Sequence, residues 1–135
     1  MYRFLEHKAD IKIEVDAKDL GDMFRDISLA CSESFFNVKK NCDADFQIVV
    51  DAESLELLIH NYIEELIYLA YYEYKFFEPI SFIILESKEG YSLQANLKII
   101  NSEKESYAVE VKACSYSIQF TKENNNYRCI FVLDI

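Results

Sequence analysis

The 135-residue chain has little glycine, proline or histidine and no tryptophan. Two glycines and one proline leave no segment with the composition of a linker or a low-complexity tract. The longest apolar run in the helical part, Leu66 to Tyr72, is too short to span a bilayer. The charged N-terminal stretch lacks the apolar core of a signal peptide. We therefore expect a single domain, residues 1–135, located in the cytoplasm and not associated with a membrane.

Cysteine and histidine are also too few and too scattered to form a familiar zinc or redox motif. The four cysteines form no CxxC pair, and neither histidine lies at zinc spacing from them. Free cysteine behaves as a small buried hydrophobe. We expect core thiols at Cys31, Cys42, Cys114 and Cys129. His60 lies on the polar face of a predicted helix and is expected to be solvated.

Motifs of common enzyme classes are missing as well. The sequence has no glycine-rich phosphate loop, nucleophile elbow, HExxH motif or EF-hand loop. Its formal net charge is −10, and no basic stripe is present that could bind phosphates. We therefore expect no strong direct binding of nucleic acid. An acidic surface instead suits a partner with a basic face.

What is present is a regular alternation of strand and helix patterns in the first half. Residues 11–16 alternate apolar and polar, which predicts a half-buried strand. Helical spacing follows from Asp19, a good N-cap, to about Phe36. Residues 45–51 predict a second strand, and a second amphipathic helix begins after Asp51.

After Pro79 the apolar period changes to two, which predicts two hairpins. Residues 80–86 and 91–99 flank a turn with Gly90, and residues 107–120 and 127–135 flank the turn-forming KENNN. The order βαβαββββ indicates an α+β, two-layer sandwich, with two helices on one face of a mainly antiparallel sheet. The apolar phase slips at Cys114, which predicts either a β-bulge or a simple bend beside Lys112.

Candidate chemistry is confined to acidic oxygens and one lysine. Asp10 enters the first predicted strand, and Asp134 lies beside the terminal carboxylate of Ile135. If the first and last strands are neighbours, these groups converge, and two carboxylates ~4 Å apart repel by about 4 kcal/mol at an effective dielectric near 20. A hard cation such as Ca²⁺ or Mg²⁺ would relieve that repulsion. Solvated surface carboxylates, and a solvated Lys112, are the simpler alternatives.

Four short motifs give a more specific indication. FLEHKAD, YIEELIY, EVKACSY and the final VLDI occur in this order over essentially the whole chain. They resemble the archease family pattern, which is close to FLEHTAD, WLNELLY, EVKAVTYH and a final LDI. Each motif is weak alone, whereas their order and the C-terminal position of the last are fairly specific.

The resemblance implies an accessory protein that activates an RtcB-type RNA ligase in tRNA splicing and RNA repair. Such a protein promotes guanylylation and multiple turnover of the ligase without catalysing ligation itself. The resemblance also implies a divalent-cation site at Asp10, Asp134 and Ile135, holding Ca²⁺ or Mg²⁺. It places Lys112, with Asp10 and Asp134, at the contact with the ligase.

The sequence departs from the family pattern at several positions. Lys8, Lys12 and Glu64 replace the usual Thr, Gly and Asn, and Ser117 stands where a His follows the tyrosine. Lys8 is expected to weaken metal affinity. Two other functions stay open at this point: a metal-dependent hydrolase that uses the same carboxylates with Lys112 as electrophile, and a metal-free interaction module. The hydrolase lacks an evident general base.

Overall fold

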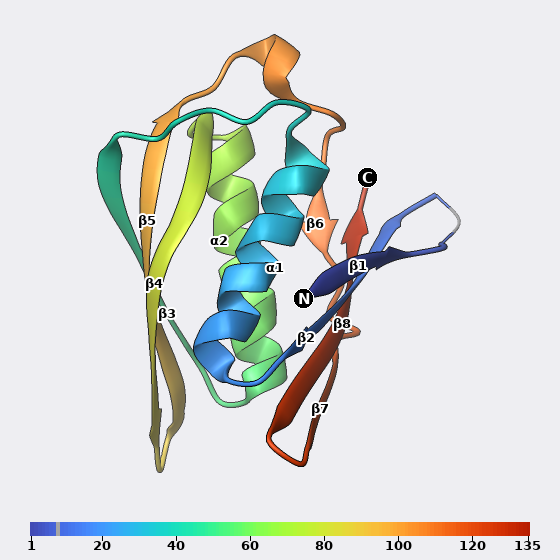
Figure 1. Ribbon diagram of the computed structural model, residues 1–135, viewed down its shortest axis with the longest axis vertical. Helices are drawn as coiled ribbons and strands as arrows, with labels where there is room; N and C mark the ends of the chain where they lie inside the picture. Colours follow the sequence, from blue (N-terminus) through green and yellow to red (C-terminus); the bar gives the residue numbers. More distant parts are fainter. Residues whose placement is uncertain (8) are drawn as a thin grey trace.

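Two antiparallel sheets enclose a pair of helices (Figure 1). The computed structural model describes residues 1–7 and 9–135. The regular elements, in chain order, are β1 (Tyr2–Leu5), β2 (Ile11–Ala17), α1 (Leu20–Phe35), β3 (Ala44–Ala52), α2 (Leu55–Tyr71), β4 (Lys75–Ser87), β5 (Gly90–Asn101), the short 3₁₀ helix η1 (Lys104–Ser106), β6 (Ala113–Cys114), β7 (Gln119–Glu123) and β8 (Asn126–Asp134).

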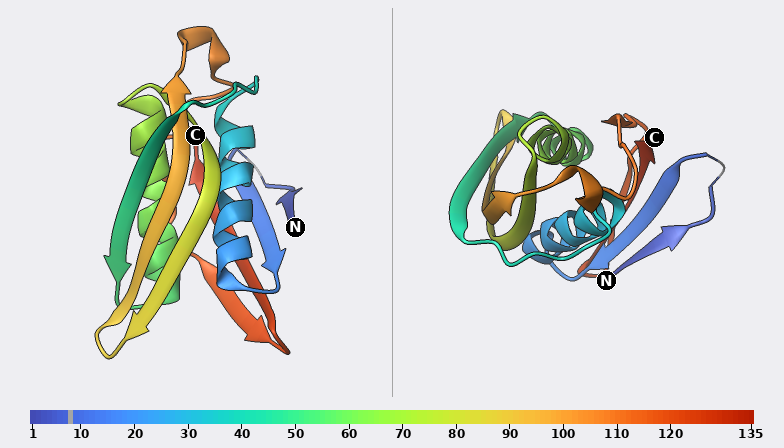
Figure 2. Two further views of the ribbon diagram at one scale, coloured as in Figure 1. Left: turned by 60° about the vertical axis from the view of Figure 1, so that its left-hand side comes forward. Right: turned by 90° about the horizontal axis from the view of Figure 1, so that it is seen from above.

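The strands divide between the two sheets by their order of pairing. The larger sheet has the order β1-β2-β8-β6, with β7 also paired to β8, and the smaller sheet has the order β3-β5-β4. Both helices lie between the sheets and contact both, as the view from above in Figure 2 shows. The predicted α+β class with two helices on antiparallel strands is confirmed. The strands form two sheets where the sequence predicted one, and β1 is an additional strand.

Side-chain caps fix the beginning of each helix. The Asp19 carboxylate accepts a hydrogen bond from the backbone N–H of Asp22 at 2.8 Å, which satisfies one of the free donors of the first turn of α1. The hydroxyl of Ser54 accepts from the N–H of Leu57 at 3.1 Å and caps α2 in the same way. The predicted N-cap of the first helix is therefore confirmed.

The core fills the space between the sheets with aromatic and aliphatic side chains. The largest fully buried side chains are Tyr62, Phe24, Phe35, Phe77, Phe131, Ile13, Met23, Ile27, Leu58, Ile59, Ile63 and Leu66. The only polar atom of Tyr62, its hydroxyl, lies 2.6 Å from the hydroxyl of Ser28, so the burial leaves no orphaned group there. Three of the four cysteines are buried and Cys42 is partly exposed; all four are free.

Tight turns close both hairpins as predicted. Gly90 has a φ of +132° between β4 and β5, and a Cβ there would lie 2.3 Å from the carbonyl oxygen of Ala52. Only glycine fits such a position. Asn124 and Asn125 take φ values of 47° and 63° between β7 and β8, a conformation that asparagine tolerates better than most residues.

The predicted long strand over residues 107–120 is wrong. Only β6 and β7 are strands in this stretch, and Lys112 lies just before β6. Residues near 107 are held elsewhere, because the N–H of Ala108 donates to the carbonyl of Phe35. Between β6 and β7 the N–H of Ile118 donates to the carbonyl of Tyr116, which forms a tight turn. The phase slip at Cys114 therefore marks the end of a strand.

Within the described part of the chain, neither helix combines the length and apolar character needed to cross a membrane.

Candidate functional site

The predicted acidic groups lie at one end of the larger sheet. Ile11 of β2 pairs with Leu133 of β8, and one further step of the same antiparallel register would set Asp10 opposite Asp134. On the other side of β8, Ala113 pairs with Asp134 itself. Asp134 therefore lies between the entry to β2 and strand β6. The close approach of Asp10, Asp134 and Ile135 to one another stays a prediction.

The backbone of Lys112 is hydrogen-bonded to Asp134. Its N–H donates to the carbonyl of Asp134 at 2.7 Å, and continuation of the β6–β8 register sets it opposite Ile135. The side chain is exposed and forms no ion pair with the residues that the structure describes. Lys112 therefore presents an exposed side chain at this edge of the sheet, although not from a strand as the sequence predicted.

The acidic groups lack strong cationic partners in residues 1–7 and 9–135. Nδ1 of His7 lies 3.7 Å from Oδ2 of Asp10, outside hydrogen-bond range. Asp134 is half-buried and Ile135 is 43% exposed, and neither forms an ion pair there. The predicted effect of Lys8 on this site falls on the one residue outside the described ranges. The negative charge at this edge is therefore accessible and largely uncompensated.

The chemistry of these donors fits a hard divalent cation. No three His, Cys, Asp or Glu side chains in the described ranges are grouped so as to hold a metal. The predicted ligand set contains only two such side chains, and the third donor is the carboxyl group of Ile135. All three supply oxygen, the ligand that Ca²⁺ and Mg²⁺ prefer. Asp10, Asp134 and Ile135 therefore fit such a cation by ligand type and by their shared position.

Helix α2 supplies two neighbours that the sequence analysis did not place here. Oε2 of Glu64 accepts a hydrogen bond from the N–H of Cys114 at 3.3 Å and ties β6 to the helix. His60 is only 3% exposed, and its ring stacks on Tyr116 with centroids 3.8 Å apart. The prediction that His60 is solvated is wrong, because the residues around β6 cover that face of α2. The i,i+4 spacing of His60 and Glu64, which sets both side chains on one face of α2, was the sequence feature that could have indicated that they lie together here.

Burial and negative charge keep the nearby thiol protonated. Burial raises the pKa of Cys114 to about 12, with further contributions from the carboxylates of Glu64 and Asp134. A thiol with this pKa carries almost no thiolate at neutral pH, and the thiolate is the metal-binding form. Cys114 therefore acts as core packing, as predicted.

The carboxylate of Glu14, on β2, is buried and paired, unlike the carboxylates of Asp10 and Asp134. Glu14 is only 2% exposed, and Arg3 Nε donates to its Oε1 at 2.7 Å while Arg128 Nε donates to its Oε2 at 2.9 Å. Hydrogen bonds from Arg128, with those from Arg3, hold the Glu14 pKa below its usual range against the effect of burial. The three residues belong to β1, β2 and β8, so they fix the register that aligns Asp10 with Asp134. The sequence pattern had placed Glu14 on the solvent face.

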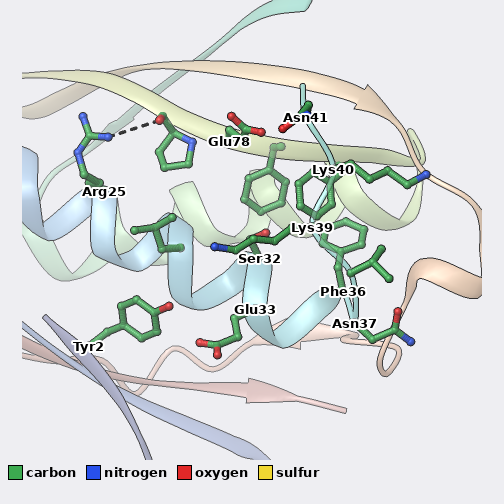
Figure 3. Close-up of a pocket in the computed structure, with 15 residues that line it drawn as sticks. Tyr2, Arg25, Ser32, Glu33, Phe36, Asn37, Lys39, Lys40, Asn41 and Glu78 are labelled. Carbon is green, nitrogen blue, oxygen red and sulfur yellow. Dashed lines mark hydrogen bonds between the residues drawn. The ribbon is translucent and has the colours of Figure 1, made fainter. Parts of the chain in front are cut away.

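A cavity lies elsewhere, between α1 and β4 (Figure 3). It has a volume of about 540 Å³ and charged side chains of both signs, among them Lys39, Glu33 and Glu78. Glu78 is engaged with the backbone N–H of Cys42 at 3.1 Å. At one end Arg25 donates to the carbonyls of Pro79 and Ile80, at 3.4 and 2.6 Å. This cavity is separate from the acidic edge and presents no single charge to a ligand.

Taken together, the fold and the acidic edge define a small α+β protein with an exposed carboxylate cluster where two strands meet. Comparison with known proteins gives the family. The model of the Archease protein family (MTH1598/TM1083) matches residues 2–135. The chain belongs to the archease family, as its four motifs suggested.

Relatives and solved structures agree with this assignment. Protein archease of Thermococcus kodakarensis is 32% identical over 114 residues, which cover 82% of this chain and 80% of the relative. Protein archease of Archaeoglobus fulgidus is 27% identical over 99% of this chain and 98% of the relative. The solution structure of Methanobacterium thermoautotrophicum protein 1598 has a TM-score of 0.84 at 20% identity, over 99% of this chain and 98% of that one. A Thermotoga maritima structure described as an archease, possible chaperone, has a TM-score of 0.65 at 17% identity, over 97% and 94%. The two structures show the same fold.

Proposed function

We propose that this protein is a non-enzymatic accessory protein that activates an RtcB-type RNA ligase in tRNA splicing and RNA repair, in the cytoplasm. Membership of the archease family supports this role. The observation that carries the proposal is the register of β2, β6 and β8, which brings Asp10, Lys112 and Asp134 to one exposed edge. The net charge of −10 suits a partner whose own surface is basic because it binds RNA.

In this proposal the acidic edge holds one divalent cation, Ca²⁺ or Mg²⁺. Asp10, Asp134 and the carboxyl group of Ile135 would be its ligands, and the cation would offset the repulsion among them. Lys112 would contact the ligase, since its side chain is exposed and its backbone is fixed to Asp134 at 2.7 Å. The register of the strands, fixed by the two arginines that bind the buried Glu14, would hold this contact surface rigid.

The test is multiple-turnover ligation by the cognate ligase with the wild-type protein, with Lys112→Ala and with Lys104→Ala. Lys104 is an exposed lysine of η1 and serves as the matched control. We expect wild type and Lys104→Ala to raise turnover and Lys112→Ala to do so poorly. Loss of an exposed side chain should change stability by less than about 0.5 kcal/mol in both variants.

Equal ligation with and without the wild-type protein would overturn the proposed function. A loss of activity in Lys112→Ala that is matched by a lower melting temperature would instead make Lys112 a structural residue.

A further inference from the structure

The two outer strands of the smaller sheet differ in how their free edges are protected. Strand β4 carries Pro79 and a register shift between Pro79 and Ser81, and Arg25 occupies the carbonyls of Pro79 and Ile80. These are the devices by which proteins block an edge against further pairing. Strand β3 has no proline, lysine or register shift: its sequence is ADFQIVVDA, and its pairing with β5 is regular over nine residues. One edge is closed and the other is open.

Strand β3 is the outermost strand of its sheet (Figure 2). In an antiparallel sheet, an outer strand directs part of its N–H and C=O groups away from its single neighbour. At one end of β3, Asn61 donates to the carbonyl of Asp51 at 3.3 Å. No other side-chain hydrogen bond to the β3 backbone is present among the described residues. Residues 45–50 therefore offer an unpaired backbone edge.

A concave surface lies along this edge. A cavity of about 380 Å³ is formed by residues 46–49 of β3 together with residues from the C-terminal half of α2 and beyond it. Its exposed apolar surface includes Phe46, 38% exposed, Val49, 61% exposed, and Tyr68, 52% exposed. Tyr68 stacks on Tyr72, with centroids 5.4 Å apart and an angle of 16° between the rings. An edge strand beside an aromatic hollow is the geometry used for recognition of extended peptides.

The charge around the hollow is negative. Glu65 and Glu73 both line it, and Glu73, through a hydrogen bond and its charge, raises the pKa of the Tyr68 phenol with a smaller contribution from Glu65. The lysine in the lining, Lys75, is engaged with Oδ1 of Asn101 at 2.5 Å. Arginine and lysine side chains bind well where carboxylates and aromatic rings are combined.

Pairing of β3 with a second copy of itself is disfavoured by the same charges. In the fully overlapping antiparallel register, centred on Ile48, Asp45 of each chain would face Asp51 of the other. Like charges directly opposite each other destabilise a strand pair. A net charge of −10 on each chain adds to the repulsion.

We propose that the open edge of β3 is a docking site for an extended, basic segment of a protein partner, which joins the sheet as an additional strand. The backbone edge would supply the main-chain hydrogen bonds. Glu65 and Glu73 would pair with arginine or lysine, and the hollow beside Tyr68 would take an apolar side chain. This surface lies on the opposite side of the molecule from the acidic edge of β8 (Figure 1), so both can be occupied at once.

The experiment uses the full chain and a synthetic peptide of about nine residues, the length of an ordinary strand, with alternating arginine and valine. A peptide of identical sequence with every second amide N-methylated keeps the charge but cannot complete a ladder. Affinity is measured by fluorescence anisotropy, and hydrogen exchange reports which amides become protected. We expect the amides that gain protection from exchange to be those of β3 and of the bound peptide. We also expect the N-methylated peptide not to bind.

Two double variants separate specific docking from general attraction to an acidic protein. Glu65→Lys/Glu73→Lys reverses the charge at the hollow, and Glu56→Lys/Glu89→Lys makes the same change at exposed residues elsewhere. We expect the first to weaken binding roughly tenfold more than the second. Equal affinities of the two variants, equal binding of the N-methylated peptide, protection outside β3, or dimerisation through β3 would each overturn the proposal. None of these outcomes depends on ligase activation.

Discussion

Strands β2 and β8, together with Asp10 just before β2, carry two groups of acidic residues with opposite environments. Glu14 is almost completely buried and is matched by two arginines, which donate to both of its oxygens. Asp10 and Asp134, four residues further along the same pair of strands, are more accessible and have no arginine beside them in the described ranges. One carboxylate has its charge neutralised within the fold, and the other pair does not.

The difference separates structural from functional charge. A buried carboxylate must be paired, because an unpaired one would cost several kcal/mol. A carboxylate pair at an exposed edge keeps its hydration, so its charge costs little desolvation free energy. The pair stays available to an external cation or a basic partner. The predictions below test this division, beginning with the largest expected effect.

Replacement of Glu14 by alanine should lower the free energy of unfolding by about 2 kcal/mol. The variant loses charge-assisted hydrogen bonds that join three strands. The loss stays moderate because the side chains of Arg3 and Arg128, 65% and 48% exposed, can return to water. Urea denaturation measures the change, with Glu110→Ala at an exposed position as control. Equal destabilisation of the two variants would mean that the Glu14 cluster has no special role.

The same cluster should make stability depend on pH in the acidic range. The Glu14 pKa is lower in the folded protein than the value of about 4.3 expected in the unfolded chain. The unfolded chain therefore takes up the proton first, so the stabilisation is complete above about pH 5 and is lost as the pH falls through the folded-state pKa. Denaturation of wild type and Glu14→Gln between pH 3 and pH 6 should give a flatter dependence of stability on pH for the variant. Parallel curves would contradict this assignment.

Replacement of Asp10 or Asp134 by alanine should have the smallest effect on the metal-free protein. Relief of carboxylate repulsion should leave stability unchanged or raise it by up to about 0.5 kcal/mol. Calcium affinity should nevertheless fall by about tenfold or more in each variant, since it follows the number of charged ligands. Calorimetric titration compares both with Asp45→Ala, whose side chain is 93% exposed on β3. Unchanged affinity in the two site variants would exclude the proposed cation site.

Local patterns predicted the elements of this fold well, and the contacts between them less well. The N-cap at Asp19, the turn at Gly90 and the strand over residues 11–16 each depend on neighbours in sequence, and these three elements are confirmed. The division into two sheets depends on which strands meet across the helices, and periodicity carries no information on that choice. The break after Cys114 appeared in the sequence as a phase slip, which a bulge would also produce.

The site was predicted in the same uneven way. The expected approach of Asp10 to Asp134 required the first and last predicted strands to be neighbours, and the pairing of Ile11 with Leu133 confirms that these strands are neighbours. The burial of Glu14 and His60 was missed. In each case the local sequence pattern predicts a solvent-facing polar residue, and a segment distant in the sequence covers it. Arg128 donates a hydrogen bond to Glu14, and Tyr116 stacks on His60. Such covering depends on tertiary contacts alone.

The position of β8 in the middle of the larger sheet has a consequence for the order in which the protein takes shape. Strands β2, β6 and β7 all pair with β8, which follows them in the chain, and the Glu14–Arg128 contact spans 114 residues. As the chain leaves the ribosome, the helices and the smaller sheet can assemble while β2 is paired with β1 alone. The larger sheet, and with it the acidic edge, can close only when β8 has emerged. A nascent chain therefore exposes one side of its helices until synthesis reaches the last strand, and any stalling before that point leaves an apolar surface open to aggregation.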